Sequence, residues 1–242
     1  MKKYIVVLWL VLGLISCSND GDGISKGDGA GGSLAIFTLR GDFLYTVDEN
    51  TLHVFNISSG ANPELVHSMF VGFGIETIYT NGNFLYLGSQ LGMYMYSLTT
   101  PETPTFVSEA RHLTACDPVV ANATHAFVTL HSNNFCGNNT NVLQVYDIQN
   151  PQQPVLVHQK NLSGPKGLGL YHNYLLVCDN NLKIFDITQP QQPQLVKTIA
   201  IQSFDVIIQG NDLFAVGPQS VYRYLLNPSD IDAIELKSQI HF

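Results

Sequence analysis

Apolar and polar residues alternate along most of the chain, in short runs that recur at a nearly constant interval. The run Gly41–Tyr45 returns as Gly82–Tyr86 and is echoed at 123–127, 172–176 and 210–214, in steps of 41, 41, 49 and 38 residues. Alternation at every second residue predicts half-buried β-strands. A repeat of this length predicts an array of similar supersecondary units.

Each repeat continues with a second alternating run and then with prolines. The second runs are Leu52–Ile57, Met93–Leu98, Leu143–Ile148, Leu182–Ile187 and Val221–Leu226. Proline cannot donate a hydrogen bond to a sheet, so prolines at this point mark the turn into an outer edge strand. We therefore expect four short strands in each repeat.

Four antiparallel strands in about 40–45 residues is the size of one propeller blade. We predict an all-β chain that forms a β-propeller of about five four-stranded blades, with a solenoid of strands as the alternative. The predicted blades are residues 34–74, 75–116, 117–166, 167–204 and 205–242. The chain is expected to begin on an inner strand and end on an outer one. Closure would then depend on packing of the fifth blade against the first, which leaves oligomerisation or partner contact open at that junction.

The first residues have the pattern of a secretory signal peptide, predicted at residues 1–16. Lys2 and Lys3 precede an apolar run that is too short to span a membrane and is followed by a polar, Gly-rich tract. Residues 14–17, Leu-Ile-Ser-Cys, resemble a bacterial lipobox. The resemblance implies cleavage before Cys17, acyl chains such as palmitate on that residue, and a bacterial cell envelope location, lipid-anchored at the outer membrane. Residues 17–33 are then the lipidated cysteine and a flexible Gly/Asp-rich tether.

Composition narrows the classes of partner. The chain has 242 residues, of which 12% are charged, and a formal net charge of −8. An acidic chain lacks the basic surface that nucleic acid requires, so we expect no nucleic-acid partner.

Three cysteines fall in the repeat region. Exported proteins meet an oxidising compartment, so we expect Cys116 to pair with Cys136, with Cys178 as a competing partner. Cys136 lies in a loop of blade three, His131 to Asn141, that lengthens this repeat and is rich in asparagine.

Glu76, Asp117 and Asp205 occupy equivalent places at the start of three inner strands, whereas Lys166 and Gly167 stand there in blade four. These carboxylates are expected near one mouth of the central channel. They form a candidate ligand or partner face together with three residues of the long loop, His131, Asn133 and Asn134. The alternative is structural: an acid at this place accepts backbone hydrogen bonds from the next blade.

No nucleophile, nucleotide-binding or metal-binding motif is present, and the histidines form no ligand set with the spacing that zinc requires. We therefore assign no catalytic residue, no metal and no cofactor.

The repeats resemble the LVIVD-repeat family. Residues 182–187, Leu-Lys-Ile-Phe-Asp-Ile, and residues 190–196, Pro-Gln-Gln-Pro-Gln-Leu-Val, match its pattern, as does 143–157 in blade three. Asn56 and Ser97 replace the aspartate in the first two blades, and the fifth blade has Leu225 and a single proline. The resemblance implies a β-propeller on surface or exported bacterial proteins and no particular chemistry.

Two functions remain open at this point. The first is a membrane-anchored, non-catalytic binding or scaffold propeller for a protein or small ligand. The second is a polysaccharide-acting hydrolase or lyase that uses the channel carboxylates, since paired carboxyl groups about 5–10 Å apart can serve as acid and base.

Overall fold

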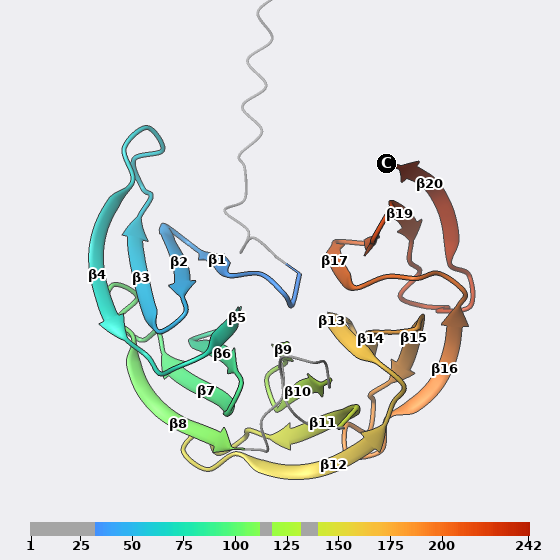
Figure 1. Cartoon of the computed structure of the whole chain (residues 1–242), viewed down its shortest axis with the longest axis horizontal. Coiled ribbons are helices and arrows are strands. Elements are labelled where there is room, and N and C mark those ends of the chain that lie inside the picture. Colours follow the sequence, from blue (N-terminus) through green and yellow to red (C-terminus); the bar gives the residue numbers. More distant parts are fainter. Residues whose placement is uncertain (1–31, 112–117, 132–139) are drawn as a thin grey trace, which may run out of the picture.

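The computed structural model describes residues 32–111, 118–131 and 140–242, and these form five antiparallel sheets of four strands each. The sheets are arranged around a central axis as the blades of a β-propeller (Figure 1). The prediction of an all-β propeller with five four-stranded blades is thereby confirmed. No helix of the described residues is of a length and hydropathy that would cross a bilayer.

The strands follow one another from the axis outward in every blade. Blade 1 contains β1 (Phe37–Arg40), β2 (Phe43–Asp48), β3 (Thr51–Asn56) and β4 (Glu64–Phe70). Blade 2 contains β5 (Ile75–Asn81), β6 (Phe84–Ser89), β7 (Gly92–Ser97) and β8 (Thr105–Arg111). Blade 3 contains β9 (Val119–Ala121), β10 (His125–Leu130), β11 (Val142–Asp147) and β12 (Val155–Asn161). Blade 4 contains β13 (Pro165–Tyr171), β14 (Tyr174–Asp179), β15 (Asn181–Asp186) and β16 (Gln194–Ile199). Blade 5 contains β17 (Asp205–Gln209), β18 (Asp212–Gly217), β19 (Ser220–Leu225) and β20 (Glu235–His241).

A two-residue turn joins the first two strands of blades 1, 2, 4 and 5. Its first residue has a positive φ: 56° at Gly41, 56° at Gly82 and 59° at Gly210, where glycine adopts this conformation without steric cost. His172 takes the same place in blade 4 with a φ of 50°. The recurring glycine in the sequence is therefore explained by the backbone of this hairpin.

The aspartate of the repeat pattern closes the turn that follows the third strand. Asp186 Oδ1 accepts hydrogen bonds from the Thr188 backbone amide at 2.7 Å and from its hydroxyl. These bonds lower the pKa of the Asp186 carboxyl. In blade 1, Asn56 accepts the Ser58 amide in the same way, which explains why a short polar side chain serves there without a charge.

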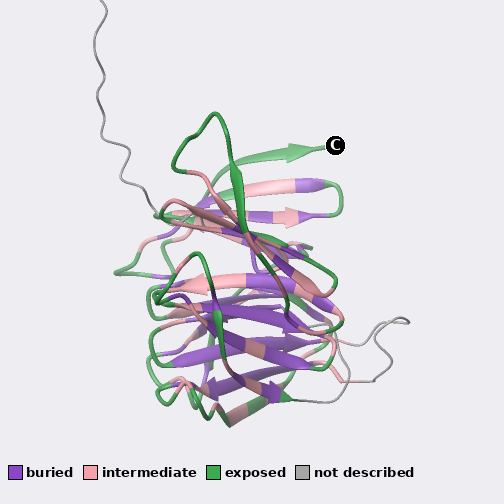
Figure 2. Ribbon diagram, turned by 90° about the vertical axis from the view of Figure 1, so that its left-hand side faces the viewer, coloured by how far each residue is buried: buried purple, intermediate pink, exposed green. Residues whose placement is uncertain are grey.

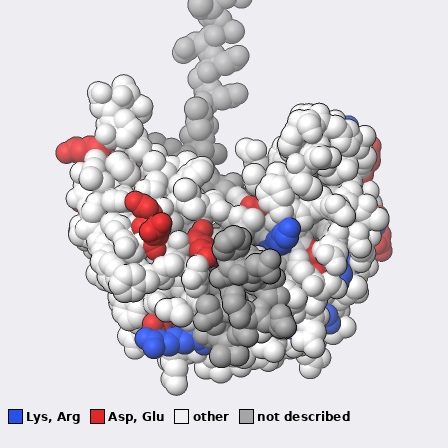
Figure 3. All heavy atoms as spheres, in the orientation of Figure 1, with Lys and Arg blue, Asp and Glu red and all other residues white. Residues whose placement is uncertain are grey.

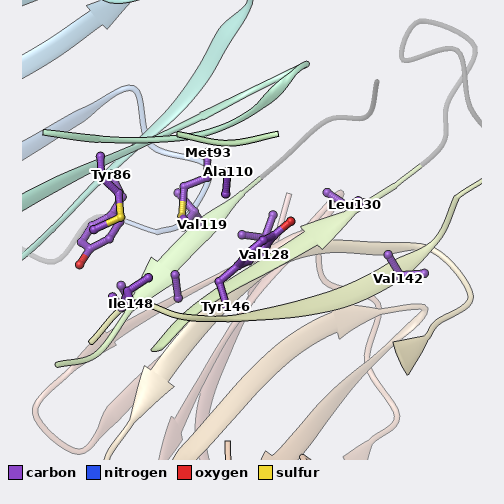
Figure 4. Packing of buried hydrophobic residues seen from close by; sticks show 12 residues of the cluster. Tyr86, Met93, Ala110, Val119, Val128, Leu130, Val142, Tyr146 and Ile148 are labelled. Atoms are coloured by element: carbon purple, nitrogen blue, oxygen red, sulfur yellow. The ribbon is translucent and has the colours of Figure 1, made fainter. Parts of the chain in front are cut away.

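The hydrophobic core consists of four clusters, each between two neighbouring blades. Figure 4 shows the one between blades 2 and 3, where Tyr86, Met93 and Met95 meet Val128 and Tyr146. The others lie between blades 1 and 2, 3 and 4, and 4 and 5. The middle strands of blades 2, 3 and 4 are accordingly mostly buried, whereas β20 is exposed along its whole length (Figure 2). Stability thus comes from contacts between successive blades.

The ring is open between blades 5 and 1 (Figure 1). The chain begins on an inner strand, β1, and ends on an outer one, β20, as predicted, and no described strand is shared between the two end blades. The expected packing of blade 5 on blade 1 is absent: no core cluster of the described residues joins them. We call this gap the seam. Its walls are mainly apolar and are formed by Phe37, Leu39, Leu44 and Phe55 of blade 1 and by Phe214, Val216, Val221 and Ile240 of blade 5, with Thr46 and Arg223 as polar members.

Candidate functional site

The first residues of β5, β13 and β17 mark one mouth of the ring, and their side chains make up the candidate site. Blade 5 contributes Asp205, blade 4 contributes Lys166, and blade 2 contributes Glu76. The long insertion of blade 3 joins β10 to β11, as expected from the sequence. On the face seen in Figure 3, acidic and basic side chains are scattered over both halves.

Glu76 is half-buried and bonded within its own blade. Its Oε1 accepts a hydrogen bond of 2.9 Å from Gln90 Nε2, and Gln90 lies in the tight turn between β6 and β7. Its carboxylate therefore supports the β6–β7 turn, a structural role within blade 2.

Asp205 is buried and connects three parts of the ring. Its carboxylate accepts hydrogen bonds from Ser33 Oγ at 3.2 Å, from the Leu34 amide at 3.3 Å and from the Val206 amide at 2.9 Å. Ser33 Oγ in turn accepts the Leu168 amide of β13 at 2.7 Å. Asp205 thus joins the segment before β1 to blades 4 and 5 near the axis. This arrangement is the structural alternative considered for the acids, in which the carboxylate accepts a backbone amide from the adjacent blade.

Burial has a direct effect on the protonation of Asp205. Removal from water raises its pKa from 3.8 to about 6, and the hydrogen bonds to Val206, Leu34 and Ser33 limit the increase. The backbones of Gly32 and Gly167 lie against this carboxylate so closely that a Cβ atom at either position would overlap it. Glycine at these two positions is thus required by the packing of Asp205.

Several predicted residues lie outside the described part of the chain: Cys17, Cys116, Asp117, Asn133, Asn134 and Cys136. The pairing of Cys116 with Cys136 therefore stays a prediction. His131 is described and half-buried, directly after β10. Among the described residues no group of histidine, cysteine and acidic side chains has the geometry to hold a metal ion.

Cys178, the alternative disulfide partner, is a free thiol inside the core between blades 4 and 5. Ser203 Oγ lies 3.2 Å from its Sγ. Burial raises the pKa of the Cys178 thiol to about 12, so the thiol stays protonated at neutral pH and is a poor nucleophile. Its role is to fill the core.

A polar pocket of about 240 Å³ opens at the mouth between blades 4 and 5. Its lining residues are Gly164, Lys166, Asn180, Gln202, Ser203, Phe204 and Pro218. Lys166 is exposed, and no ion pair joins its ammonium group to an acid of the described residues. The Phe204 ring is 36% exposed and supplies an apolar wall. The pocket therefore combines one cation, two amides, a hydroxyl and an aromatic face.

The rim of this pocket is held by a buried carboxylate behind it. Asp179 accepts the Ser163 and Gly164 amides at 2.9 and 2.6 Å, and Lys183 Nζ lies 2.6 Å from its Oδ2. The next residue, Asn180, has a φ of 55°, an uncommon conformation that asparagine tolerates better than most residues. These contacts fix the loop before β13 against the β14–β15 turn.

The sequence interpretation missed most of this pocket. It noted Lys166 only because this residue stands where three other blades have an acid. That replacement was the signal of the pocket that the sequence contained. Asn180 comes from the β14–β15 turn, whereas Gln202 and Phe204 come from the connection between β16 and β17. No spacing in the sequence brings these residues together.

A family model for the LVIVD repeat matches residues 31–70 and 166–200, which correspond to blade 1 and blade 4. Two blades of this β-propeller thus match the LVIVD repeat. A search of curated proteins finds no match to the sequence.

Solved structures share the fold of this LVIVD-repeat propeller at low sequence identity. A functionally unknown protein from Desulfotomaculum acetoxidans aligns with a TM-score of 0.67 at 11% identity, over 83% of this chain and 66% of that chain. The periplasmic gluconolactonase of Pseudomonas aeruginosa aligns at 0.62 and 11% identity, over 83% and 68%. BamB from Moraxella catarrhalis aligns at 0.53 and 13% identity, over 73% and 52%. The LVIVD-repeat chain thus spans about half to two thirds of these longer proteins, and the likeness shows the fold alone.

Proposed function

We propose that the protein is a lipid-anchored, extracytoplasmic binding module that holds a small hydroxylated anion, such as a sugar acid, in the pocket between blades 4 and 5. The observation that carries this proposal is the chemistry of the pocket lining. A carboxylate on the ligand matches the ammonium of Lys166, which forms no ion pair with an acid of the described residues, and hydroxyl groups match the amides of Asn180 and Gln202. The Phe204 ring offers an apolar surface on which a sugar ring can stack.

A binding role fits this pocket better than hydrolysis. Among the described residues, none of the side chains that line the pocket is a carboxylate. Asp205, one of the three acids that the hydrolase alternative offers as acid or base, is buried and directs its oxygens at Ser33 and Leu34. Substrate would have to displace these contacts before it reached the carboxyl group.

Titration calorimetry with a matched set of sugars tests the pocket. We expect galacturonate to bind at least tenfold more tightly than neutral galactose, which is about 1.4 kcal/mol. Replacing Lys166 with glutamine should remove this difference and leave the weak binding of galactose unchanged. Lys237→Gln is the control, because Lys237 lies on the outer strand β20, in an ion pair with Glu235. Equal binding of the acid and the neutral sugar, or tight binding that survives Lys166→Gln, would overturn the proposal.

The anchor is tested separately through Cys17. In cells fed radiolabelled palmitate, the wild-type chain is expected to carry label and to sediment with membranes. Cys17→Ala should abolish the label and leave the chain unanchored, because no acyl chains remain to enter the bilayer. A Cys17→Ala chain that still carried label and sedimented with membranes would contradict the anchor while leaving the pocket untouched. The control is Cys178→Ala, which changes a cysteine in the core and should keep the label.

A further inference from the structure

At the seam, apolar side chains are exposed whose equivalents in the other blades are buried between neighbouring blades. On the blade 1 side a hollow of about 490 Å³ is lined by Ile36, Phe37, Leu39, Leu44 and Thr46. Phe37 is 50% exposed although it lies on an inner strand. In the space-filling view a notch separates the two ends of the ring (Figure 3). Apolar side chains that line a gap of this kind indicate a missing contact.

The repeat shows what normally covers the blade 1 face. Leu44 pairs with Phe55 across β2 and β3, and both are only half-buried. The residues equivalent to Leu44 in the other blades are Leu85, Ala126, Leu175 and Leu213, all with no exposed surface. The residues equivalent to Phe55 are Tyr96, Tyr146, Phe185 and Tyr224, all buried. Each of these pairs packs against the preceding blade. Blade 1 therefore carries the surface that fits a preceding blade.

Blade 5 carries the complementary surface. Phe214 and Val221 are half-buried on the face of β18 and β19 that points away from blade 4. The residues equivalent to Phe214 are Tyr45, Tyr86, Phe127 and Leu176, and those equivalent to Val221 are Leu52, Met93, Leu143 and Leu182, all at most 1% exposed. In blades 1 to 4 these residues pack against the following blade. Blade 5 thus has the surface that fits a following blade.

We propose that the seam is occupied by a blade-type antiparallel β-sheet, apolar on both faces, that another protein supplies as a sixth blade. The argument is that a blade in the seam would form two more interfaces of the kind that already joins the five blades. Most of the residues on the two walls are of the types found at the four existing interfaces. Two polar side chains break the pattern. Thr46 stands where blades 2 to 5 have Leu87, Val128, Val177 and Ala215, and Arg223 stands where blades 1 to 4 have Val54, Met95, Val145 and Ile184. Arg223 forms an ion pair with Asp212 at 2.9 Å. The occupant is therefore expected to present a polar side chain opposite this pair.

A second copy of the chain does not meet this requirement. The seam has two apolar walls, so its occupant needs two uncovered faces. Blades 2, 3 and 4 have both faces packed against neighbours, and blades 1 and 5 have one face packed. No blade of a second copy is free on both sides while its own ring stays intact.

Site-specific photocrosslinking on the lipidated chain in its own membranes tests the occupant. A benzophenone amino acid at Thr46, in the seam, is expected to give one discrete adduct with a different protein. The crosslinked peptide should alternate apolar and polar residues as a strand does. The control position is Leu195, 49% exposed on β16, the outer strand of blade 4, which does not border the seam. Leu44→Lys with Val216→Lys should reduce the adduct at least tenfold.

The proposal is overturned by an adduct between two copies, by a crosslink from Thr46 to blade 5 of the same chain, by the same adduct from Leu195, or by no adduct.

A second measurement does not depend on the partner. Residues 165–204, one complete blade, are fused after Phe242 through a flexible linker. The added blade should raise the Tm by at least 5 °C, and Leu44→Lys with Val216→Lys should abolish the increase. An unchanged Tm in the fusion would show that the seam does not accept a blade.

Discussion

Replacing Leu175 with alanine is expected to lower the free energy of unfolding by about 2–5 kcal/mol, whereas the same change at Leu44 should cost about 1 kcal/mol or less. The two leucines occupy the same position of the repeat. Leu175 has no exposed surface and packs in the core between blades 3 and 4. Leu44 is half-buried on the wall of the seam, where no blade covers it. The difference therefore measures how much of the interblade interface is missing at the seam.

Urea unfolding of the purified chain checks this prediction. The two variants are matched in residue type, strand and register, so intrinsic strand propensity contributes equally to both. Similar losses at the two positions would mean that Leu44 is covered in solution and that the ring closes on itself. A further control is Leu195→Ala on β16, where the side chain is exposed and a small loss is expected.

Asp205 is expected to make the fold less stable as the pH rises from 4 to 7, by about 3 kcal/mol. Its pKa is 3.8 in the unfolded reference and about 6 in the folded chain. Between these values the folded chain binds the proton more strongly than the unfolded chain does. The stabilisation is therefore complete below pH 4 and is lost as the pH rises through 6. Asp186, whose pKa is lowered by Thr188, contributes in the opposite direction.

The measurement is the difference between the wild-type chain and Asp205→Asn in urea unfolding at several pH values. This difference isolates Asp205 from the other carboxyl groups, which titrate in both proteins. Asparagine keeps the shape of the side chain and does not titrate, so the variant should lack the loss of stability between pH 4 and 7. Parallel pH profiles of the two proteins would show that Asp205 is not buried as the structure places it.

The sequence predicted the fold because the residue pattern of one blade recurs five times. Leu44 and its equivalents, the glycine of the first hairpin and the prolines before the outer strand recur at fixed places. Each has a local cause: alternation for a half-buried strand, positive φ for Gly41 and Gly82, and a missing donor for proline. Because of this repetition, the number of blades and the order of their strands could be predicted from the sequence.

The open seam and the pocket were not predictable in the same way. Whether blade 5 meets blade 1 depends on the accumulated angle between successive blades, which no single residue encodes. The pocket depends on which side chains of Lys166, Asn180 and Gln202 converge from separate connections. Asp205 was found from its place at the start of an inner strand, yet its partners, Ser33 and Leu34, lie more than 170 residues away. Long-range contacts of this kind follow from the assembled ring.

The central claim is that the protein is a binding propeller with its ligand site between blades 4 and 5. Hydrogen exchange with and without galacturonate tests this claim most directly. We predict that galacturonate slows exchange at the backbone amides of residues 163, 164, 166, 180, 181 and 202–204, which line or border the pocket. The same residues in Lys166→Gln should show no protection at equal ligand concentration. Protection elsewhere on the ring, or none at a concentration that saturates binding in the calorimeter, would contradict the claim.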